Sequence, residues 1–378
     1  PASLHIVNPG DGVTLSRSPA SVDVSSGGTA TFSVAASSTG GLTYQWFRYK
    51  AGEGLRSLAG ETSPTLQISS ATAADMGFYF ARVSDGVETV DSDYAILTLT
   101  GGTSRLANLS TRGSVPANGT LIPGFVIDGT GTKDIVVRAA GPLLAGFGVT
   151  AAMEDPQLAL VSSEDPRLEN DDWQDSANAS ALVSASAAVG AQPLAEGSKD
   201  AAILTSVPLR AQGGSKGYTV EVSATDGAPG IALAEVYDTE LGAETSRLTN
   251  VAARGCSGAA ESALIPGFVI AGEGARTMLD RLAGPLLASF GLPNTMADPQ
   301  LEVIPSGQTF AVAGNDNWGG TAALKAAFQA TGAFPFENDS TLDAAVLVRL
   351  PPGGYTVRVT GADGGVGEVI VEAYEVIE

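Results

Sequence analysis

The stretch Leu121-Ile-Pro-Gly-Phe-Val-Ile127 occurs a second time, without a single change, as residues 264–270. Its run of apolar and β-branched residues is followed in both places by a glycine, which is typical of a β-strand that ends in a turn. Further matches surround both occurrences in the same order. The chain therefore contains an internal duplication, which has to be recognised before any other feature is interpreted.

The matching segments cover two long regions of the chain. The pairs are Arg105–Asn108 with Arg247–Asn250, Gly141–Ala145 with Gly284–Ala288, Asp155–Leu158 with Asp298–Leu301, Asn170–Trp173 with Asn315–Trp318, Asp200–Ala202 with Asp343–Ala345, Tyr218–Val220 with Tyr355–Val357, and Glu235–Tyr237 with Glu372–Tyr374. They define two homologous repeats at 105–240 and 247–378. A third domain is expected at 17–100, and 1–16 is expected to be an N-terminal extension.

Each copy is predicted to be rich in short strands separated by Gly, Pro, Asp and Asn. In the first copy the expected strands are Leu121–Ile127, Asp134–Ala139, Gln157–Val161, Ala201–Val207, Tyr218–Ala224 and Ile231–Tyr237. Short helices are expected at 143–147, 177–189 and 321–330. Because long helices between strands are absent, a parallel α/β sheet is excluded. We expect an all-β chain of three β-sandwich domains in series, with one or two short helices in each homologous sandwich.

The composition excludes several classes of function. Among 378 residues, 20 Lys and Arg stand against 41 Asp and Glu, so the formal net charge is −21. Nucleic acids and anionic membrane surfaces require a basic face, so neither is an expected partner. No apolar run is long enough to predict membrane insertion as a helix. A surface that is poor in lysine and rich in Ser, Thr, Gly and acids is typical of secreted or cell-surface proteins.

Residues 17–100 contain a strand with a central Trp46, followed about 30 residues later by Asp75-Met-Gly-Phe-Tyr79. This pattern resembles the immunoglobulin fold, specifically the I-set-like domains of bacterial surface proteins. The resemblance implies that Tyr79 forms a tyrosine corner and that Trp46 lies in the core. Val34 and Ala81 stand near the positions of the family's two cysteines, so apolar packing is expected in place of the disulfide.

The duplicated region has its own family likeness. Its string of Arg-Leu-x-Asn, Gly-Phe-Val-Ile, Arg-x-x-Gly-Pro and Asn-Asp-x-Trp is similar to modules of very large bacterial cell-surface and autotransporter-like proteins. Those modules follow immunoglobulin-like units, which implies a non-catalytic surface protein. The closing strand and the Glu-x-Tyr ending are also similar to calcium- or sugar-binding accessory domains of secreted enzymes.

Two clusters of oxygen-bearing side chains are candidate calcium sites: Asn170, Asp171 and Asp172 in the first copy, and Asn315, Asp316 and Asn317 in the second. Calcium takes six to eight oxygen ligands, which carboxylates and amides supply. The alternative is an Asx turn followed by a tryptophan that packs on the core. If the two tryptophans are instead exposed, they are the candidate platforms for a sugar.

Catalytic chemistry has few candidates. The single histidine, His5, lies in the N-terminal stretch, and the single cysteine, Cys256, corresponds to a serine in the first copy. Neither suits a preorganised nucleophile and base, although an intermolecular link through Cys256 stays open. Arg138 and Arg281 flank a core strand, where pairing with Asp155 and Asp298 would clamp a loop. We therefore expect no enzymatic activity.

The extension contains Leu4 and Ile6 in strand-like alternation. One interpretation is a linker or an extra edge strand. The other is a donor strand that pairs with a neighbouring subunit, because β-augmentation uses such segments. Head-to-tail contacts of this kind do not close and build filaments.

The sequence thus predicts an extracellular or cell-surface protein that is structural or adhesive, such as the protomer of a surface fibre assembled by strand exchange. Its expected partners are further copies of itself or other surface proteins, with polysaccharide as a further option. The alternative function is a carbohydrate- or calcium-binding accessory module of a secreted protein. No cofactor is expected apart from the possible calcium.

Overall fold

The computed structural model describes residues 12–240, 242, 245–257, 263–362 and 364–377. The chain forms two compact units. The first comprises Pro1–Ser104, Glu273–Ala275 and Arg349–Pro352, and the second Arg105–Gly272, Arg276–Val348 and Gly353–Glu378. Both copies of the duplicated region fall in the second unit. The predicted donor-strand residues Leu4 and Ile6 lie outside the described residues.

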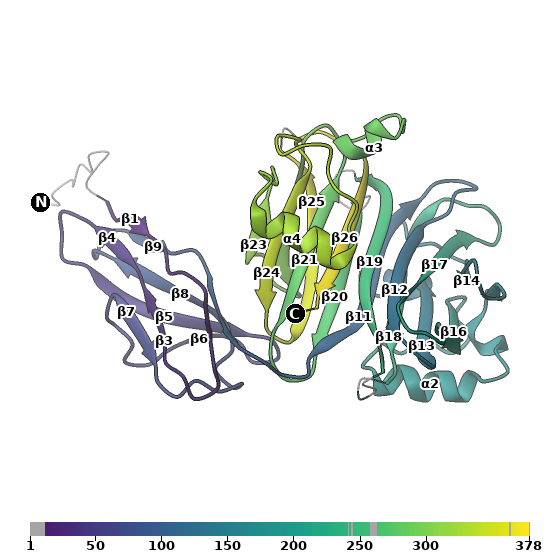
Figure 1. The fold of residues 1–378 in the computed structure, drawn as a ribbon, viewed down its shortest axis with the longest axis horizontal. Coiled ribbons are helices and arrows are strands. Elements are labelled where there is room, and N and C mark those ends of the chain that lie inside the picture. Colours follow the sequence, from purple (N-terminus) through teal and green to yellow (C-terminus); the bar gives the residue numbers. More distant parts are fainter. Residues whose placement is uncertain (1–11, 241, 243–244, 258–262, 363, 378) are drawn as a thin grey trace, which may run out of the picture. The chain divides into compact units, whose positions relative to one another are not determined.

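The first unit is an immunoglobulin-like sandwich (Figure 1). Its strands are β1 (Thr14–Arg17), β2 (Val22–Val24), β3 (Ala30–Ser33), β4 (Ala35–Ser37), β5 (Thr43–Lys50), β6 (Gly54–Ser57), β7 (Thr65–Ile68), β8 (Gly77–Ser84), β9 (Thr89–Asp91) and β10 (Ala95–Leu99). One sheet has the order β2-β10-β8-β5-β6, with β2 parallel to β10, and β3 pairs with β7 in the other sheet.

The core of this unit confirms the predicted packing. Trp46 is fully buried and its ring lies 6.2 Å from Phe32, which stacks on Tyr79 at 5.0 Å. The Tyr79 hydroxyl donates a hydrogen bond to the Asp75 carbonyl at 2.5 Å, which is the tyrosine corner. Val34 and Ala81 are both buried in the same cluster. Apolar packing therefore fills the space that a disulfide would occupy.

Replacing Tyr79 with phenylalanine should lower the free energy of unfolding of the first unit by about 1 kcal/mol. The change removes one hydrogen bond and leaves the partly buried Asp75 carbonyl to find another partner. Calorimetry that resolves the unfolding of the two units measures this loss. A Tyr79→Phe variant with an unchanged transition would contradict the corner's contribution.

The second unit carries sixteen paired strands among its described residues. The first copy supplies β11 (Arg105–Val115), β12 (Ile122–Gly129), β13 (Thr132–Ala140), β14 (Pro156–Val161), β15 (Leu168–Asn170), β16 (Ala201–Pro208), β17 (Ser215–Ala224) and β18 (Gly230–Asp238). The second copy supplies β19 (Ser246–Ser257), β20 (Ile265–Ala271), β21 (Arg276–Ala283), β22 (Pro299–Pro305), β23 (Ala313–Asn315), β24 (Ala344–Leu350), β25 (Gly353–Gly361) and β26 (Gly367–Val376). The all-β prediction is confirmed.

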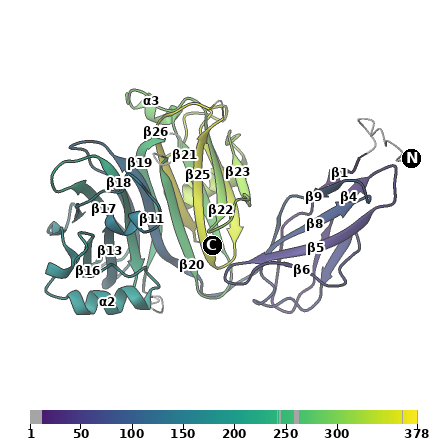
Figure 2. The same ribbon diagram turned by 180° about the vertical axis from the view of Figure 1, so that it is seen from behind.

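The strands of the two copies pair with one another and form continuous layers, as Figures 1 and 2 show from opposite sides. One layer has the order β16-β13-β18-β11-β20-β25-β22-β23, and the other the order β24-β21-β26-β19-β12-β17-β14-β15. Each copy contributes half of each layer. The junctions are the antiparallel pairs β11–β20 and β12–β19, which we call the seam.

Four α-helices accompany these strands in the described part of the chain: α1 (Pro142–Ala145), α2 (Ala179–Ala188), α3 (Pro285–Ser289) and α4 (Ala322–Thr331). Helices α1, α2 and α4 match the predicted helical segments, and α3 is the counterpart of α1 in the second copy. Helix α4 has a side-chain N-cap, since Thr321 accepts a hydrogen bond from the Leu324 N–H, and Gly332 ends it at φ 70°. None of the described helices has the length and apolar character that a membrane-spanning helix needs.

Candidate functional site

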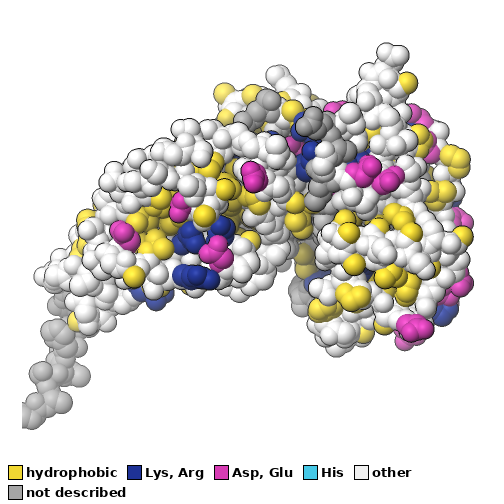
Figure 3. Space-filling view, turned by 90° about the horizontal axis from the view of Figure 1, so that it is seen from below, with side chains coloured by type: hydrophobic (Ala, Val, Ile, Leu, Met, Phe, Trp, Pro, Cys, Tyr) yellow, Lys and Arg dark blue, Asp and Glu magenta, His cyan; other side chains and the backbone are white. Residues whose placement is uncertain are grey.

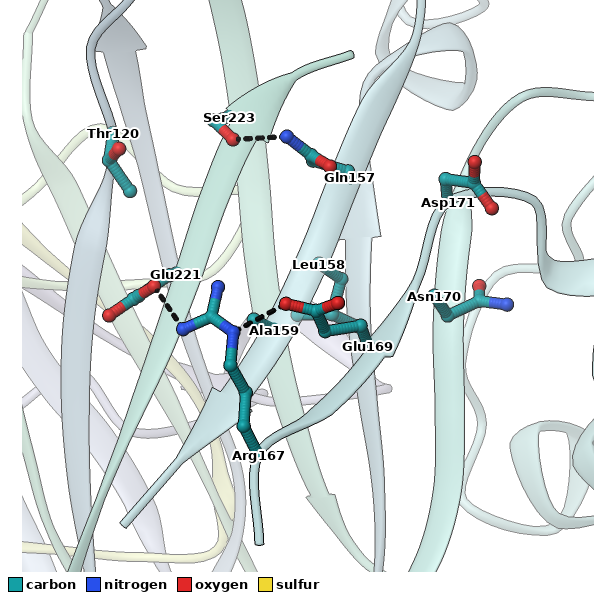
Figure 4. Close-up of a pocket in the computed structure, with 10 residues that line it drawn as sticks. All are labelled: Thr120, Gln157, Leu158, Ala159, Arg167, Glu169, Asn170, Asp171, Glu221 and Ser223. Carbon is teal, nitrogen blue, oxygen red and sulfur yellow. Dashed lines mark hydrogen bonds and ion pairs between the residues drawn. The ribbon is translucent and has the colours of Figure 1, made fainter. Parts of the chain in front are cut away.

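A polar cavity of about 440 Å³ lies on one sheet face of the first copy (Figure 4). Directly paired residues of antiparallel strands share a face of the sheet. Gln157 pairs with Ser223, and Ala159 pairs with both Glu221 and Glu169. These side chains therefore lie on the same face. The lining residues are Thr120, Gln157, Leu158, Ala159, Arg167, Glu169, Asn170, Asp171, Glu221 and Ser223. Of these residues, Asn170 and Asp171 are candidate calcium ligands predicted from the sequence.

The charges of the cavity are partly paired within it. The Arg167 guanidinium lies 2.5 Å from a Glu169 oxygen and 2.7 Å from a Glu221 oxygen. These two hydrogen-bonded carboxylates raise the pKa of Arg167. The Gln157 amide donates to the Ser223 hydroxyl at 3.0 Å. Because the lining carries more carboxylates than cations, it suits a ligand with hydroxyl, amide or cationic groups.

The corresponding face of the second copy has different chemistry. By alignment of the matching segments, Glu302 stands in place of Ala159 and Arg358 in place of Glu221. Arg358 forms an ion pair with Glu302. A base therefore replaces the acid Glu221, an acid replaces Ala159, and the cavity's charge pattern is not repeated.

The candidate calcium residues of the two copies lie on different edges. Asn170 ends β15 and Asn315 ends β23, and these strands are the edge strands of different layers. Asp171 lines the polar cavity, and Asp172 pairs with Lys199 at 3.2 Å. Asp316 and Asn317 are exposed. Within the described ranges, no group of three or more His, Cys, Asp or Glu side chains is placed to hold a metal ion.

The two asparagines connect the layers at the outer edge of each copy. The Asn170 side-chain oxygen accepts a hydrogen bond from the Ala202 N–H at 2.8 Å, and its amide donates to the Asp172 carbonyl at 2.9 Å. The Asn315 oxygen accepts from the Ala345 N–H at 3.4 Å. Each asparagine thus joins the last strand of one layer to the first residues of the edge strand of the other.

Replacing Asn170 with alanine should lower the free energy of unfolding of the second unit by about 1–2 kcal/mol, because the partly buried Ala202 N–H loses its acceptor. Asn315→Ala is the matched control, and the longer hydrogen bond there predicts a smaller loss. Denaturant unfolding of both variants measures the difference. Equal losses, or none, would contradict this role.

The adjacent tryptophans are buried, with Trp173 8% and Trp318 4% exposed. Their indole N–H groups donate to the Ala195 and Asn338 carbonyls at 3.3 Å and 3.0 Å. Trp318 also stacks on Phe328 of α4 at 5.4 Å. Neither ring is available as an exposed platform for a sugar. Both tryptophans pack on the core, as the alternative to a calcium site expected, whereas the asparagine oxygens accept from the Ala202 and Ala345 N–H groups.

Arg138 and Arg281 are fully buried, and their predicted pairing with Asp155 and Asp298 is wrong. Arg138 pairs with Glu235 at 3.3 Å, and Arg281 with Glu372 at 2.8 Å. The reason is register, because each arginine lies directly opposite that glutamate on the neighbouring strand.

Each of these glutamates has a second partner on its own strand. The Tyr237 and Tyr374 hydroxyls donate to Glu235 and Glu372 at 2.7 Å and 2.6 Å. Burial and the adjacent carboxylate raise the pKa of both tyrosines. Each copy thus contains its own Arg–Glu–Tyr cluster.

Two buried aspartates fix the Gly-Pro turns. Asp200 accepts hydrogen bonds from the Gly141 and Leu143 N–H groups at 2.8 Å and 3.2 Å. Asp343 accepts the equivalent bonds from Gly284 and Leu286 at 2.9 Å and 3.2 Å. Burial raises the pKa of Asp343. The repeated Asp-Ala-Ala segment was the sequence signal for this role.

Cys256 lies on β19 and is exposed. It lines a second cavity of about 380 Å³ together with residues of both copies, including Ser114 and Glu368. Burial and the Glu368 carboxylate raise the pKa of the thiol. These surroundings do not activate it as a nucleophile.

Comparisons with known proteins give structural neighbours only. No protein family and no curated protein matches the chain. The chain is similar to the tandem Ig repeats of Dlar, at 16% identity over 24% of this chain and 50% of that chain, with a TM-score of 0.22. It is also similar to a chimeric titin Z1Z2, at 24% identity over 24% and 94% of the two chains, with a TM-score of 0.19. The match to DIP-gamma IG1+IG2 has 19% identity, covers 24% and 49%, and has a TM-score of 0.20. The chain thus spans about half the length of the Dlar and DIP-gamma chains that it matches.

Proposed function

We propose that this chain is a non-catalytic structural or adhesive part of an extracellular surface protein. The observation that carries the proposal is the role of the polar residues shared by the two copies. Arg138 and Arg281 each bind the glutamate opposite, and Asp200 and Asp343 each fix a turn. What the duplication preserves is the scaffold.

The face that could hold a ligand has diverged between the copies. Glu221 pairs with Arg167 in the first copy, whereas the second copy has Arg358 at the equivalent position, paired with Glu302. A duplicated catalytic centre would be expected to keep its acid and base positions. The divergence therefore favours a scaffold with variable surfaces. It disfavours a binding site that is present in both copies.

The surface composition supports an extracellular display role. Charged side chains are sparse on the face drawn in Figure 3, where much of the surface consists of uncharged side chains and backbone. Lys, Arg, Asp and Glu make up 16% of the chain, and its formal net charge is −21. Such an acidic, lysine-poor exterior favours solubility outside the cell.

Labelling of intact source cells with antibodies against the chain tests this proposal. We expect surface label by electron microscopy without permeabilisation, and loss of label after brief treatment with external protease. Label that appears only after permeabilisation would overturn the extracellular role. Purified protein should show no turnover with ester, peptide or glycoside substrates in parallel assays.

The more specific form of the proposal is a fibre in which residues 1–10 act as a donor strand to the next subunit. Leu4 and Ile6 are the residues whose alternation motivates it. Deletion of residues 1–10 should abolish self-assembly measured by light scattering and electron microscopy. Fibres that form unchanged from the truncated chain would exclude the donor strand and leave the surface role intact.

A second candidate function is a calcium- or sugar-binding accessory module. One observation favours it: Glu169, Asn170 and Asp171 line the same polar cavity. Calorimetric titration of metal-stripped protein with Ca²⁺ tests the site, with Asp171→Ala as the variant. Heat that disappears in the variant would support calcium, and no heat in either protein would exclude it. Affinity electrophoresis in polysaccharide gels tests sugars in the same way.

A further inference from the structure

The seam has the residue pattern of an interface between identical subunits. Across one junction Phe125 lies opposite Val251, and across the other Phe268 lies opposite Leu109. The same correspondence holds along both junctions, because the repeated Leu-Ile-Pro-Gly-Phe-Val-Ile strings each pair with the first strand of the other copy. In an isologous interface, residue i of one subunit contacts residue j of the other, and residue j of the first subunit contacts residue i of the second.

A pseudo-twofold axis passes through this interface. Leu106 on β11 lies directly opposite Leu248 on β19, and the matching segments make these two leucines counterparts of one another. A residue that faces its own counterpart marks a twofold axis. Both leucines are fully buried. An irregularity of register also occurs beside the axis on each side, between Leu106 and Asn108 and between Val126 and Ile127.

The seam strands are held equally firmly to their own copies. The Asn108 amide donates to the Val236 carbonyl of β18 at 3.2 Å, and the Asn250 amide donates to the Ala373 carbonyl of β26 at 3.2 Å. Each first strand therefore belongs to a self-contained half, and its outer edge is the edge that meets the other half. Of the four outer edge strands of the layers, β15 and β23 have three residues each, whereas β16 and β24 have eight and seven.

We propose that the seam is a recognition surface for a second copy of the same module, and that two chains exchange halves through it. In the exchanged pair, each seam joins a half of one chain to a half of the other. The hinge is the connection between β18, which ends at Asp238, and β19, which begins at Ser246. This inference goes beyond the proposed function, since it does not depend on where the protein acts.

One buried side chain contacts described residues on both sides of this connection. The Lys133 ammonium donates to the Glu240 carbonyl at 3.2 Å and lies 3.5 Å from the Ser246 carbonyl, so it contacts both ends of the connection. The same ammonium pairs with Asp238 at 2.6 Å. Loss of Lys133 should therefore free the hinge and favour exchange.

The experiment uses the full chain with a specific protease site inserted after Gly242. The protein is unfolded, refolded at about 10 µM and at about 500 µM, and sized by gel filtration with light scattering. A short linker gives the second half an effective concentration in the mM range, so exchange should compete only at the higher concentration. We expect a dimer fraction that rises at least about fivefold between the two conditions and persists on dilution.

Cutting the hinge identifies the interface that holds the dimer. In an exchanged dimer, the two hinges are the only link between the two seam-joined pairs of halves. Cutting both hinges should therefore return particles with the mass of one chain. If each seam instead joins two first copies or two second copies, cutting should return these two kinds of pair separately. A dimer that keeps its mass after cutting would overturn the proposal, and so would monomer at both concentrations.

A pair of matched variants tests the role of the hinge. Lys133→Met should raise the dimer fraction above that of the unmodified chain. Lys216→Met is the control, because Lys216 is also buried and binds one carboxylate and one carbonyl, those of Asp165 and Pro208, without contacting the hinge. Equal dimer fractions in the two variants would exclude Lys133 as the restraint.

Discussion

Replacing Asp280 with valine should raise the free energy of unfolding of the second unit by about 4 kcal/mol at pH 7. Asp280 lies on β21 and is fully buried, and neither carboxyl oxygen has a hydrogen-bond partner among the described residues. Burial alone raises its pKa to about 8. The first copy has Val137 at this position, also fully buried, so the module accommodates valine there.

The pH dependence of this gain follows from the raised pKa. Below about pH 4, the ordinary pKa of an aspartate in the unfolded chain, both states hold the proton and Asp280 costs no ionisation energy. Between about pH 4 and pH 8 the unfolded state releases the proton while the folded state retains it, so stability falls by about 1.4 kcal/mol per pH unit. The wild-type chain should lose stability across this window, and Asp280→Val should lose much less.

Denaturant unfolding at several pH values between 4 and 8 measures both effects. Asp280→Asn is the matched control, since it removes the ionisable group while keeping a buried polar side chain. It should abolish the slope without the full gain in stability. The reverse change in the first copy, Val137→Asp, should destabilise the unit most at high pH. Parallel pH profiles for the wild type and Asp280→Val would contradict this account.

Replacing Lys133 with methionine should lower the free energy of unfolding of the second unit by about 3–5 kcal/mol, because it leaves a buried carboxylate without its counter-ion. Lys133 and Asp238 are both fully buried and their charged atoms lie 2.6 Å apart. The second copy has an equivalent arrangement, in which Arg276 lies 3.3 Å from the buried Glu375. Equivalent positions of the two copies thus carry an ion pair with a fully buried carboxylate.

The double variant Lys133→Met, Asp238→Leu separates the pair's own contribution from the cost of an orphaned charge. Apolar residues of similar volume often replace a buried ion pair with little loss, so the double variant should recover most of the stability. Lys216→Met should cost less than Lys133→Met, because its partner Asp165 retains 16% exposure and can be solvated. A double variant as unstable as the single one would show that the contacts of Lys133 with the hinge carbonyls dominate.

Much of the fold could be predicted from the sequence. The six strands expected in the first copy correspond to β12, β13, β14, β16, β17 and β18. Strong apolar alternation between Gly and Asp turns makes these segments recognisable. Trp46 and Tyr79 likewise identified the sandwich of the first unit, because a core tryptophan and a tyrosine corner are specific to it.

Two of the four strands that form the seam, β11 and β19, were missed. Strand β11 contains Arg, Asn, Ser, Thr and Gly, which have low or moderate strand propensity. Its register with β20 shifts between Leu106 and Asn108, so the apolar residues do not alternate strictly. The alternation of apolar and polar residues also shows which face of a strand is buried, but it does not show which strand pairs with it. The joining of the two copies into common layers could therefore not be derived from one sequence.

The candidate site was predicted only in part. Asn170 was singled out for its oxygen, but its hydrogen bond to Ala202 spans 32 residues, and only the three-dimensional pairing of the layers reveals it. The partner of Arg281 was misassigned for the same reason, since Glu372 lies 91 residues away along the chain. The charged pair of the cavity face, Arg167 and Glu221, belongs to no repeated motif and carried no signal.

The opposition of Leu106 and Leu248 bears on how the two halves have been able to diverge. In a pair of separate identical subunits, every substitution appears on both sides of the axis and its energetic penalty is doubled. Covalent fusion removes this constraint, because a destabilising residue can then be present in one copy only and its energetic penalty is counted once. Asp280 without a counterpart in the first copy, and the acidic cavity without one in the second, are the kind of one-sided specialisation that fusion permits.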